Sequence, residues 1–193
     1  LYEAGVTNVT APQGTAFTTH QAMLLKRLVG EVVLCFDSDA AGRKAAARSL
    51  PALLEKELRV RMLELPPGED PDSLVRREGG DAFRERVAAA PDFLTARIAT
   101  ARESGQLESG EGVSAVAREL AGWFAQIPDD VLRDRMINSA AAGLKISPAS
   151  FHNLVRKSKK FESDPAPEDE GPQTRPPVAL SPGCELLCRL ALF

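Results

Sequence analysis

The sequence contains few cysteines and few aromatic residues, and it has no long apolar run. The 193 residues contain three cysteines, and no second pair of Cys or His residues completes the spacing of a zinc site. We therefore expect no zinc in this stretch. No signal peptide is visible, and no apolar run approaches the ~20 residues that span a bilayer. We therefore expect a cytoplasmic protein with reduced cysteines and no membrane partner.

A strong excess of basic charge is also missing. Lys and Arg number 24 against 27 Asp and Glu, which gives a net charge of −3. This balance excludes a strongly basic nucleic-acid footprint at the level of the whole chain, although five of the acids fall within residues 162–170 and a basic surface can still exist locally. A hydrophobic content of 44% suits one compact domain and a second small one.

The first 65 residues alternate between strand and helix patterns. Strands are predicted at about 6–11, 31–36 and 58–65, and helices at about 19–28 and 40–56. Residues 31–36 form a near-continuous apolar run, which is typical of a strand covered on both faces. Thr18 or Thr19 would cap the first helix, whose inner face would hold Ala22, Leu25 and Leu28. This order predicts an α/β unit with a parallel sheet.

Helical patterns fill the next part of the chain. Helices are expected from Ser73 to a break at Gly79-Gly80, and then at about 81–89, 91–105, 111–125, 128–142 and 148–157. Trp123 and Phe124 would lie in the core of this helical part. Residues 158–182 are rich in Pro and acids, which predicts a disordered linker, and a last helix is expected from about Glu185. Because the chain starts and stops within helical patterns, we expect a piece cut at both ends.

Two acids, Asp37 and Asp39, follow the apolar strand at 31–36. In an extended chain they would point to the same side at the carboxyl end of the strand, which is the edge of a parallel sheet where ligands bind. Neighbouring carboxylates repel each other unless a cation compensates, and Mg²⁺ binds through one or two carboxylates together with water and phosphate oxygens. The pair therefore predicts a metal site for phosphoryl transfer. The alternative is that Asp39 caps the next helix and Asp37 is a solvated loop acid.

Other loops open on the same predicted edge. The segment 68–72 holds three acids in four residues, and its alternative reading is a turn in which Asp72 caps the following helix. The loop at 13–18 carries Gly14 and Thr15, and on its own it reads equally as a capping loop. Arg43 lies in the first turn of the helix after the acid pair, where it would contact phosphate or belong to a solvated face.

The loop at 13–18, the acid pair at 37 and 39 and the segment 68–72 follow one another along the chain. Together they resemble the TOPRIM domain of bacterial DnaG-type primases, and the resemblance runs from the start of the chain to about residue 95. Residues 36–43 resemble the family's Asp-x-Asp motif, with Ser38 in place of the Gly often found between the acids. Residues 68–75 resemble an element specific to primases. The resemblance implies a TOPRIM-type, Rossmann-like α/β fold over 1–90, a helical subdomain over 91–157, a linker over 158–182 and the start of a helicase-binding domain over 183–193.

The resemblance also implies the roles of individual residues. Asp37 and Asp39 would be catalytic and would bind Mg²⁺, for which Mn²⁺ can substitute. The full set of metal-site residues would be Asp37, Asp39, Asp70 and Asp72. The residues in contact with nucleotide or nucleic acid would be Gly14, Thr15 and Arg43.

The implied activity is that of a DNA primase, which joins ribonucleoside triphosphates into short RNA primers on a single-stranded DNA template and works with a replicative helicase. In the family a catalytic Glu would precede residue 1, and Glu3 is not assigned that role. Zn²⁺ would belong to a domain further upstream. Because these parts are missing, this stretch alone is expected to be inactive. One alternative is a TOPRIM nuclease or topoisomerase, for which Tyr2 is the only tyrosine. Another is a non-catalytic module that holds helicase or DNA through residues 91–157 and the tail.

Overall fold

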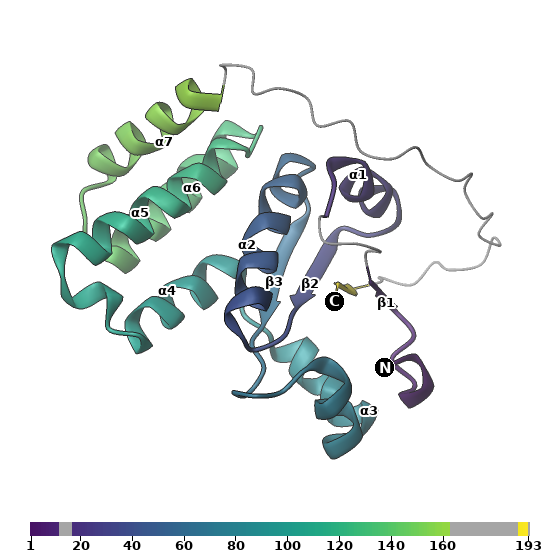
Figure 1. The fold of residues 1–193 in the computed structure, drawn as a ribbon. Helices are drawn as coiled ribbons and strands as arrows, with labels where there is room; N and C mark the ends of the chain where they lie inside the picture. Colours follow the sequence, from purple (N-terminus) through teal and green to yellow (C-terminus); the bar gives the residue numbers. More distant parts are fainter. Residues whose placement is uncertain (12–16, 163–188, 193) are drawn as a thin grey trace.

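The computed structural model describes residues 1–11, 17–162 and 189–192. The loop that carries Gly14 and Thr15 lies outside the described residues, as does most of the expected linker. The described parts form a small parallel sheet, helices that cover its faces, and a group of further helices on one side (Figure 1). Within these parts, no helix has the length and apolar character needed to cross a bilayer.

The sheet contains four parallel strands in the order β1-β4-β2-β3. The strands are β1 (Val9–Thr10), β2 (Glu31–Cys35), β3 (Arg59–Leu63) and β4 (Arg189–Leu192). β2 and β3 pair in register from their first to their last residues, so their carboxyl ends lie level with each other. The predicted parallel α/β unit is confirmed, but β1 is shorter than the strand predicted at 6–11 because its ladder with β4 includes only two residue pairs.

The helix predicted from Glu185 is wrong for residues 189–192, which form β4. β4 lies between β1 and β2 and pairs with both of them. An unpaired backbone N–H or C=O group is costly away from water, so a segment that satisfies two neighbouring strands at once is favoured as a strand. This long-range pairing overrides the local helical pattern.

The first two helices follow local signals. α1 (Thr19–Leu28) is capped by Thr18, one of the two threonines that the sequence predicted as the cap, and the Thr18 side chain forms a capping box with Gln21. Ala22 and Leu25 are buried, but Leu28 is 58% exposed. The prediction of Leu28 as an inner residue is wrong because the helix ends there, and Val29 takes the buried position in extended conformation. α2 (Ala40–Glu55) follows β2.

Strand β2 is buried on both faces, as its apolar run predicted. Val32 and Leu34 belong to a cluster that includes α1, α2 and the later helices. Val33 and Cys35 belong to a second cluster with α3 (Pro71–Ala89). All four residues are at most 1% exposed, so the strand runs through the middle of the fold and its carboxyl end has a fixed place.

α3 is bent in the middle and anchored at its end. Gly79 has φ 86° and ψ 163°, which breaks the helix where the Gly-Gly pair predicted it. The neighbouring Gly80 lies against the carbonyl of Ala4, in the short 3-10 helix η1 (Tyr2–Ala4), and a Cβ there would be 1.9 Å from that oxygen. At the far end, Arg61 of β3 donates hydrogen bonds to backbone carbonyls of residues 88 and 90 at 2.7 and 2.6 Å.

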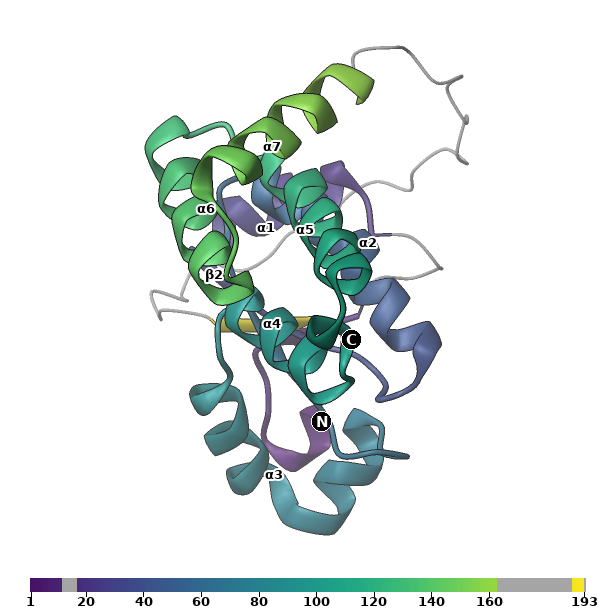
Figure 2. The ribbon, with the colours of Figure 1, turned by 90° about the vertical axis from the view of Figure 1, so that its left-hand side faces the viewer.

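The remaining helices form a bundle: α4 (Phe93–Glu103), α5 (Gly110–Ala125), α6 (Asp130–Leu144) and α7 (Pro148–Glu162), with the 3-10 helix η2 (Gln106–Glu108) before α5. Figure 2 shows α5, α6 and α7 side by side. Phe93 packs edge-on against Trp123 and Phe124, and Phe124 continues to Phe151 at 5.6 Å. Trp123 and Phe124 are therefore core residues, as predicted. α7 extends into the stretch that was expected to be linker.

Candidate metal-binding site

The predicted acid pair lies where β2 gives way to α2. β2 ends at Cys35, and the chain bends at Ser38 and Asp39, so the alternation of an extended strand does not extend to the two acids. Both aspartates are exposed. Among the described residues, the carboxylate of Asp37 has no hydrogen-bond or ion-pair partner.

Asp39 is the N-cap of α2, which is the structural alternative that the sequence left open. Its Oδ1 accepts a hydrogen bond from the backbone N–H of Gly42 at 2.7 Å. A cap of this kind satisfies one of the unpaired N–H groups at the helix start. It uses one carboxylate oxygen, and Oδ2 makes no hydrogen bond to any described residue, so capping and metal binding are compatible.

Gly42 explains how the start of α2 fits so closely beside Asp37. A Cβ at this position would lie 2.2 Å from the Asp37 carbonyl oxygen and 2.9 Å from the Asp37 backbone nitrogen. Only a residue without a side chain allows this approach. The Gly in the Asp-Ser-Asp-Ala-Ala-Gly segment therefore fixes the position of the acidic turn relative to the helix.

Ser38 joins the two acidic loops. Its hydroxyl accepts a hydrogen bond from the backbone N–H of Gly68 at 2.9 Å, and its own N–H donates to the carbonyl of Glu69 at 3.3 Å. A glycine at position 38 would lack the first of these bonds. The structure thus brings together the segments 37–39 and 68–70, which the sequence predicted to meet at one edge of the sheet.

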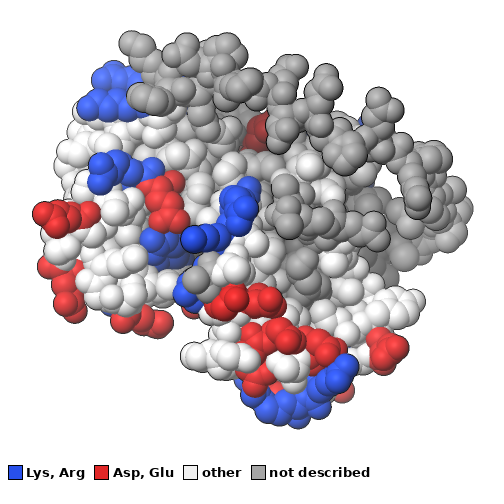
Figure 3. Space-filling view, in the orientation of Figure 1, with Lys and Arg blue, Asp and Glu red and all other residues white. Residues whose placement is uncertain are grey.

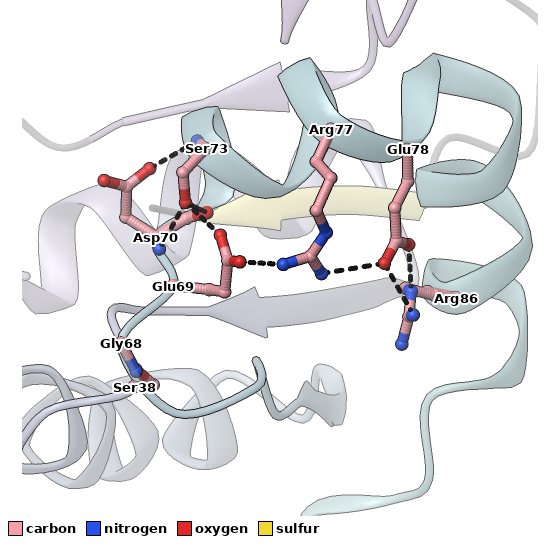
Figure 4. A network of polar contacts seen from close by, with 8 residues as sticks. All are labelled: Ser38, Gly68, Glu69, Asp70, Ser73, Arg77, Glu78 and Arg86. Atoms are coloured by element: carbon pink, nitrogen blue, oxygen red, sulfur yellow. Dashed lines mark hydrogen bonds and ion pairs between the residues drawn. The ribbon is translucent and has the colours of Figure 1, made fainter.

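Glu69 is held by a chain of charged residues that runs along α3 (Figure 4). Its carboxylate accepts hydrogen bonds from Ser73 and Arg77. Arg77 also contacts Glu78 at 2.9 Å, and Glu78 binds Arg86 at 2.7 Å. Hydrogen bonds from Arg86 and then Arg77 lower the pKa of the Glu78 carboxyl. Because Arg86 lies beyond the bend at Gly79, these contacts connect the acidic loop to both halves of α3.

The remaining acids of this loop also have partners within the chain. α3 begins at Pro71 and is capped by Asp70, whose Oδ1 accepts from the Ser73 N–H at 2.7 Å. The prediction that Asp72 caps this helix is therefore wrong, because the helix starts before it. Asp72 lies in the first turn and pairs with Arg76 at 3.0 Å, with both side chains largely exposed. A metal role for Asp70 and Asp72 remains a prediction.

Arg43 lies close to the acids, and its guanidinium faces the turn. Its Nη1 donates to the carbonyl of Ser38 at 2.7 Å. Gly14 and Thr15, the other residues predicted to contact nucleotide, lie outside the described residues.

Glu64 is an acid that sequence reasoning missed. It follows β3 directly, at the same edge of the sheet as Asp37, and its carboxylate accepts a hydrogen bond from Thr100 of α4. Both Glu64 and Asp37 line a cavity of about 120 Å³ together with Arg43. The sequence does show that Glu64 is the first acid after a predicted strand. To place it beside Asp37, however, one must also know that this strand pairs in register with β2.

Burial protects the thiol next to the acid pair. Burial raises the pKa of Cys35 to about 12, and the negative charge of Asp37 contributes in the same direction. The thiol is therefore neutral near pH 7 and is a core residue, as its apolar surroundings predicted.

The donors at this edge suit a metal that needs few protein ligands. The described residues include no group of three or more His, Cys, Asp or Glu side chains arranged to hold an ion. Zn²⁺ and Ca²⁺ ordinarily require more protein ligands than two carboxylates. Mg²⁺ is ordinarily bound by one or two carboxylates with water and substrate phosphates, so it needs no more protein ligands than this edge offers.

Two family models match the chain. One, described as Toprim-like, matches residues 1–75, and the other, described as the DnaB-helicase binding domain of primase, matches residues 97–149. The first contains β1, β2, β3 and the acidic loops, and the second contains most of α4, all of α5 and α6, and the start of α7.

Solved and curated proteins give the same relationship. The DNA primase of Clostridium acetobutylicum is 32% identical over 155 residues, which cover 80% of this chain and 26% of the relative. The crystal structure of the zinc-binding and RNA polymerase domains of Aquifex aeolicus primase aligns with a TM-score of 0.67 at 30% identity, over 81% of this chain and 36% of that one. The structure of a DnaG primase catalytic domain bound to ssDNA aligns with a TM-score of 0.63 at 30% identity, over 77% and 48%. The chain spans about a quarter of the length of the curated relatives it matches, and it belongs to the family of bacterial DnaG-type DNA primases.

Proposed function

We propose that this chain supplies the metal-binding acids of a DNA primase, which synthesises short RNA primers on single-stranded DNA. The observation that carries the proposal is Asp37, an exposed carboxylate with no hydrogen-bond or ion-pair partner among the described residues. It lies just after the carboxyl end of β2, a central strand buried on both faces, in a chain of the primase family. The enzyme class is a nucleotidyltransferase, and the substrates are ribonucleoside triphosphates and a DNA template. One of the aligned structures is a primase catalytic domain bound to ssDNA, which supports the choice of template.

The proposed metal is Mg²⁺, with Mn²⁺ as a substitute. Asp37 and the free oxygen of Asp39 would hold it, and the bound ion would supply positive charge beside the phosphates of the incoming nucleotide. Ser38 keeps the two acidic loops together through its bonds to residues 68 and 69. Arg43, held by the Ser38 carbonyl, provides a guanidinium at the same edge for a phosphate oxygen.

The proposed protein partner is a replicative helicase. The support is the match of residues 97–149 to a family described by its binding to DnaB helicase. We therefore propose the helicase contact on α4, α5, α6 and the first residues of α7, rather than on the domain expected to start within 183–193.

Metal titration of the chain tests the site directly. Mn²⁺ binding, followed by electron paramagnetic resonance, should weaken at least about tenfold in Asp37→Ala, because removal of one of two carboxylates costs more than 1.4 kcal/mol. Glu111→Ala, an exposed acid in the first turn of α5, is the matched control and should bind Mn²⁺ as the unaltered chain does. Unchanged binding in Asp37→Ala would remove the proposal and favour a non-catalytic module.

Activity is tested in the full gene product that contains residues 1–193. The double variant Asp37→Ala, Asp39→Ala should lose primer synthesis on a single-stranded template, and its loss of stability should not exceed the roughly 0.5–2 kcal/mol that removal of the Asp39 N-cap costs. Retained primer synthesis would exclude these acids from the reaction. Metal-dependent cleavage of DNA without primer synthesis would instead assign the site to a nuclease.

A further inference from the structure

The sheet has a strand position that the chain fills from its far end. From β1 the chain passes through α1 to β2, yet β1 and β2 are not neighbours in the sheet. β4 lies between them, and in Figure 1 this yellow strand lies beside β1. Strands that follow each other in sequence usually lie next to each other, as β2 and β3 do. The facing edges of β1 and β2, residues 9–10 and 31–34, thus form a slot for a distant segment, which we call the β1–β2 slot.

The β1–β2 slot binds its occupant mainly through β2. β4 pairs with β2 over four residues, from Arg189 beside Glu31 to Leu192 beside Leu34, and with β1 over only two. All of these pairs are parallel. Strand pairing uses backbone N–H and C=O groups, which every residue except proline offers in full. The slot therefore selects an extended backbone in one direction rather than one particular sequence.

Apolar contacts rather than charges decide which side chains suit the β1–β2 slot. Residues 32–34 of β2 are at most 1% exposed and contribute to clusters on both faces of the sheet. The edges of the slot carry one charged side chain, Glu31, which pairs with Arg61 of β3 at 3.3 Å. In Figure 3, Lys, Arg, Asp and Glu side chains instead gather over α3 and the bundle. A strand beside β2 therefore fits best when it is apolar on both faces.

Residues 189–192 suit a helix better than a strand. Arg, Leu and Ala are strong helix formers, and the segment contains no β-branched residue. β1, by contrast, consists of Val and Thr, and the middle of β2 contains two Val residues. β4 is thus held as a strand by its pairing rather than by its own preference. Residues 163–188 separate α7 from β4, and at up to about 3.5 Å per residue they reach far enough for β4 to leave the sheet while α7 stays in place.

We propose that the β1–β2 slot is a binding site for an extended apolar strand of a partner protein, and that residues 189–192 are its exchangeable occupant. A partner strand rich in Val or Ile runs parallel to β2 and takes over the four ladder pairs of β4. When no partner is bound, the tail keeps the backbone groups of β2 paired. The tail is therefore a competitor of the partner, built into the chain. The slot is distinct from the metal site, because the pairing with β4 ends at Leu34, before Asp37.

Peptide binding to the full chain tests the slot. The probe is a fluorescein-labelled peptide whose core, Arg-Val-Val-Val, replaces the four residues of β4, with lysines at both ends for solubility. Ala191→Pro removes a backbone N–H from β4 and should empty the slot, because proline is not tolerated within a central strand. Fluorescence anisotropy should show that Ala191→Pro binds the peptide at least about tenfold more tightly than the unaltered chain, in which the tail fills the slot for more than about nine-tenths of the time. Ala179→Pro, the same change in the Pro-rich stretch, is the matched control and should bind as the unaltered chain does.

Hydrogen exchange in the unaltered chain gives a second measurement, which does not depend on the folding of a variant. The amides of residues 189–192 should exchange at least roughly tenfold faster than those in the middle of α5, because β4 opens by itself. Excess peptide should raise the exchange of 189–192 further and leave that of α5 unchanged. Equal exchange of the two segments would overturn the inference, since β4 would then open only with the whole fold.

The binding assay has its own contrary outcomes. Equal binding of the peptide to Ala191→Pro and Ala179→Pro would show that the tail does not compete for the slot. Equal binding of a second peptide, with proline in the middle of its core, would show apolar adsorption without strand pairing. Asp37→Ala should leave peptide binding unchanged, so failure of the slot is distinguishable from failure of the metal site.

Discussion

The contact between Gly42 and Asp37 gives the sharpest test of how the acidic turn is built. In Gly42→Ala the new Cβ would lie 2.2 Å from the Asp37 carbonyl oxygen, whereas ordinary contacts begin at 3.4 Å. The start of α2 and the acidic turn must therefore separate by roughly an ångström, because the clash is with backbone. Overpacking of this kind costs about 1–3 kcal/mol, and the better helix propensity of Ala returns at most about 1 kcal/mol. We expect a net loss of about 1–2 kcal/mol, or a fall in Tm of about 2–8 °C for a chain of this size.

The matched control is Gly122→Ala in α5, where a Cβ would meet nothing within 4 Å. This change should leave the stability unchanged or raise it by up to about 1 kcal/mol. Thermal and urea unfolding, followed by circular dichroism, measures both variants, and Mn²⁺ titration reports the site. We expect Gly42→Ala alone to weaken Mn²⁺ binding, since it moves Asp37 relative to Asp39. If Gly42→Ala is as stable as Gly122→Ala and binds Mn²⁺ normally, the close approach does not shape the site.

Three further changes follow from other contacts. Ser38→Ala removes the acceptor for the Gly68 N–H. It should lower Mn²⁺ affinity about two- to fivefold and cost about 0.5–1 kcal/mol of stability. Unaltered amide exchange at Gly68 would argue against the hydrogen bond between the two acidic loops. Arg61→Ala should lower the free energy of unfolding in urea by about 1.5–3 kcal/mol, because it frees the end of α3. The control, Arg59→Ala, changes an exposed side chain and should stay within about 0.5 kcal/mol of the unaltered chain. Equal effects of the two changes would contradict the anchoring role of Arg61. Because the Cys35 pKa rises from 9.0 to about 12 on folding, the unfolded thiol ionises first, and stability should fall as the pH rises from 9 toward 12. Urea unfolding near pH 8 and near pH 10 should show a smaller fall for Cys35→Ala, and an identical fall would refute the assignment.

The parts of the fold that local signals determine could be predicted from the sequence. The apolar run before Asp37 marked β2, because a strand covered on both faces excludes polar side chains. Thr18 marked the start of α1, because its hydroxyl can cap a helix. Gly79 marked the bend in α3, because a residue without a side chain readily adopts a positive φ.

The parts that depend on distant residues could not be predicted. β4 forms only because β1 and β2 both pair with it, and no pattern within residues 189–192 carries that information. The exposure of Leu28 depends on where α1 ends, which the helical period of the sequence does not give.

The acid pair shows a different limit. An aspartate between a strand and a helix is the same residue whether it caps the helix, binds a metal or does both, so the sequence could not separate these roles for Asp39 or Asp70. The bond between Ser38 and Gly68 joins residues 30 positions apart, and it is what brings the two acidic segments together.

The shared core of the sheet and the bundle has a practical consequence for dividing this chain. Leu50 and Leu53 of α2 belong to the same buried cluster as Leu120 and Phe124 of α5. A polypeptide ending near residue 90 would remove α5 from this cluster and expose apolar side chains of α2 that pack against it, at a cost of up to roughly 1.5–3 kcal/mol for a side chain that becomes fully exposed. The truncated polypeptide would expose an apolar surface and would be prone to aggregate, so the sheet and the helices after it should be expressed together.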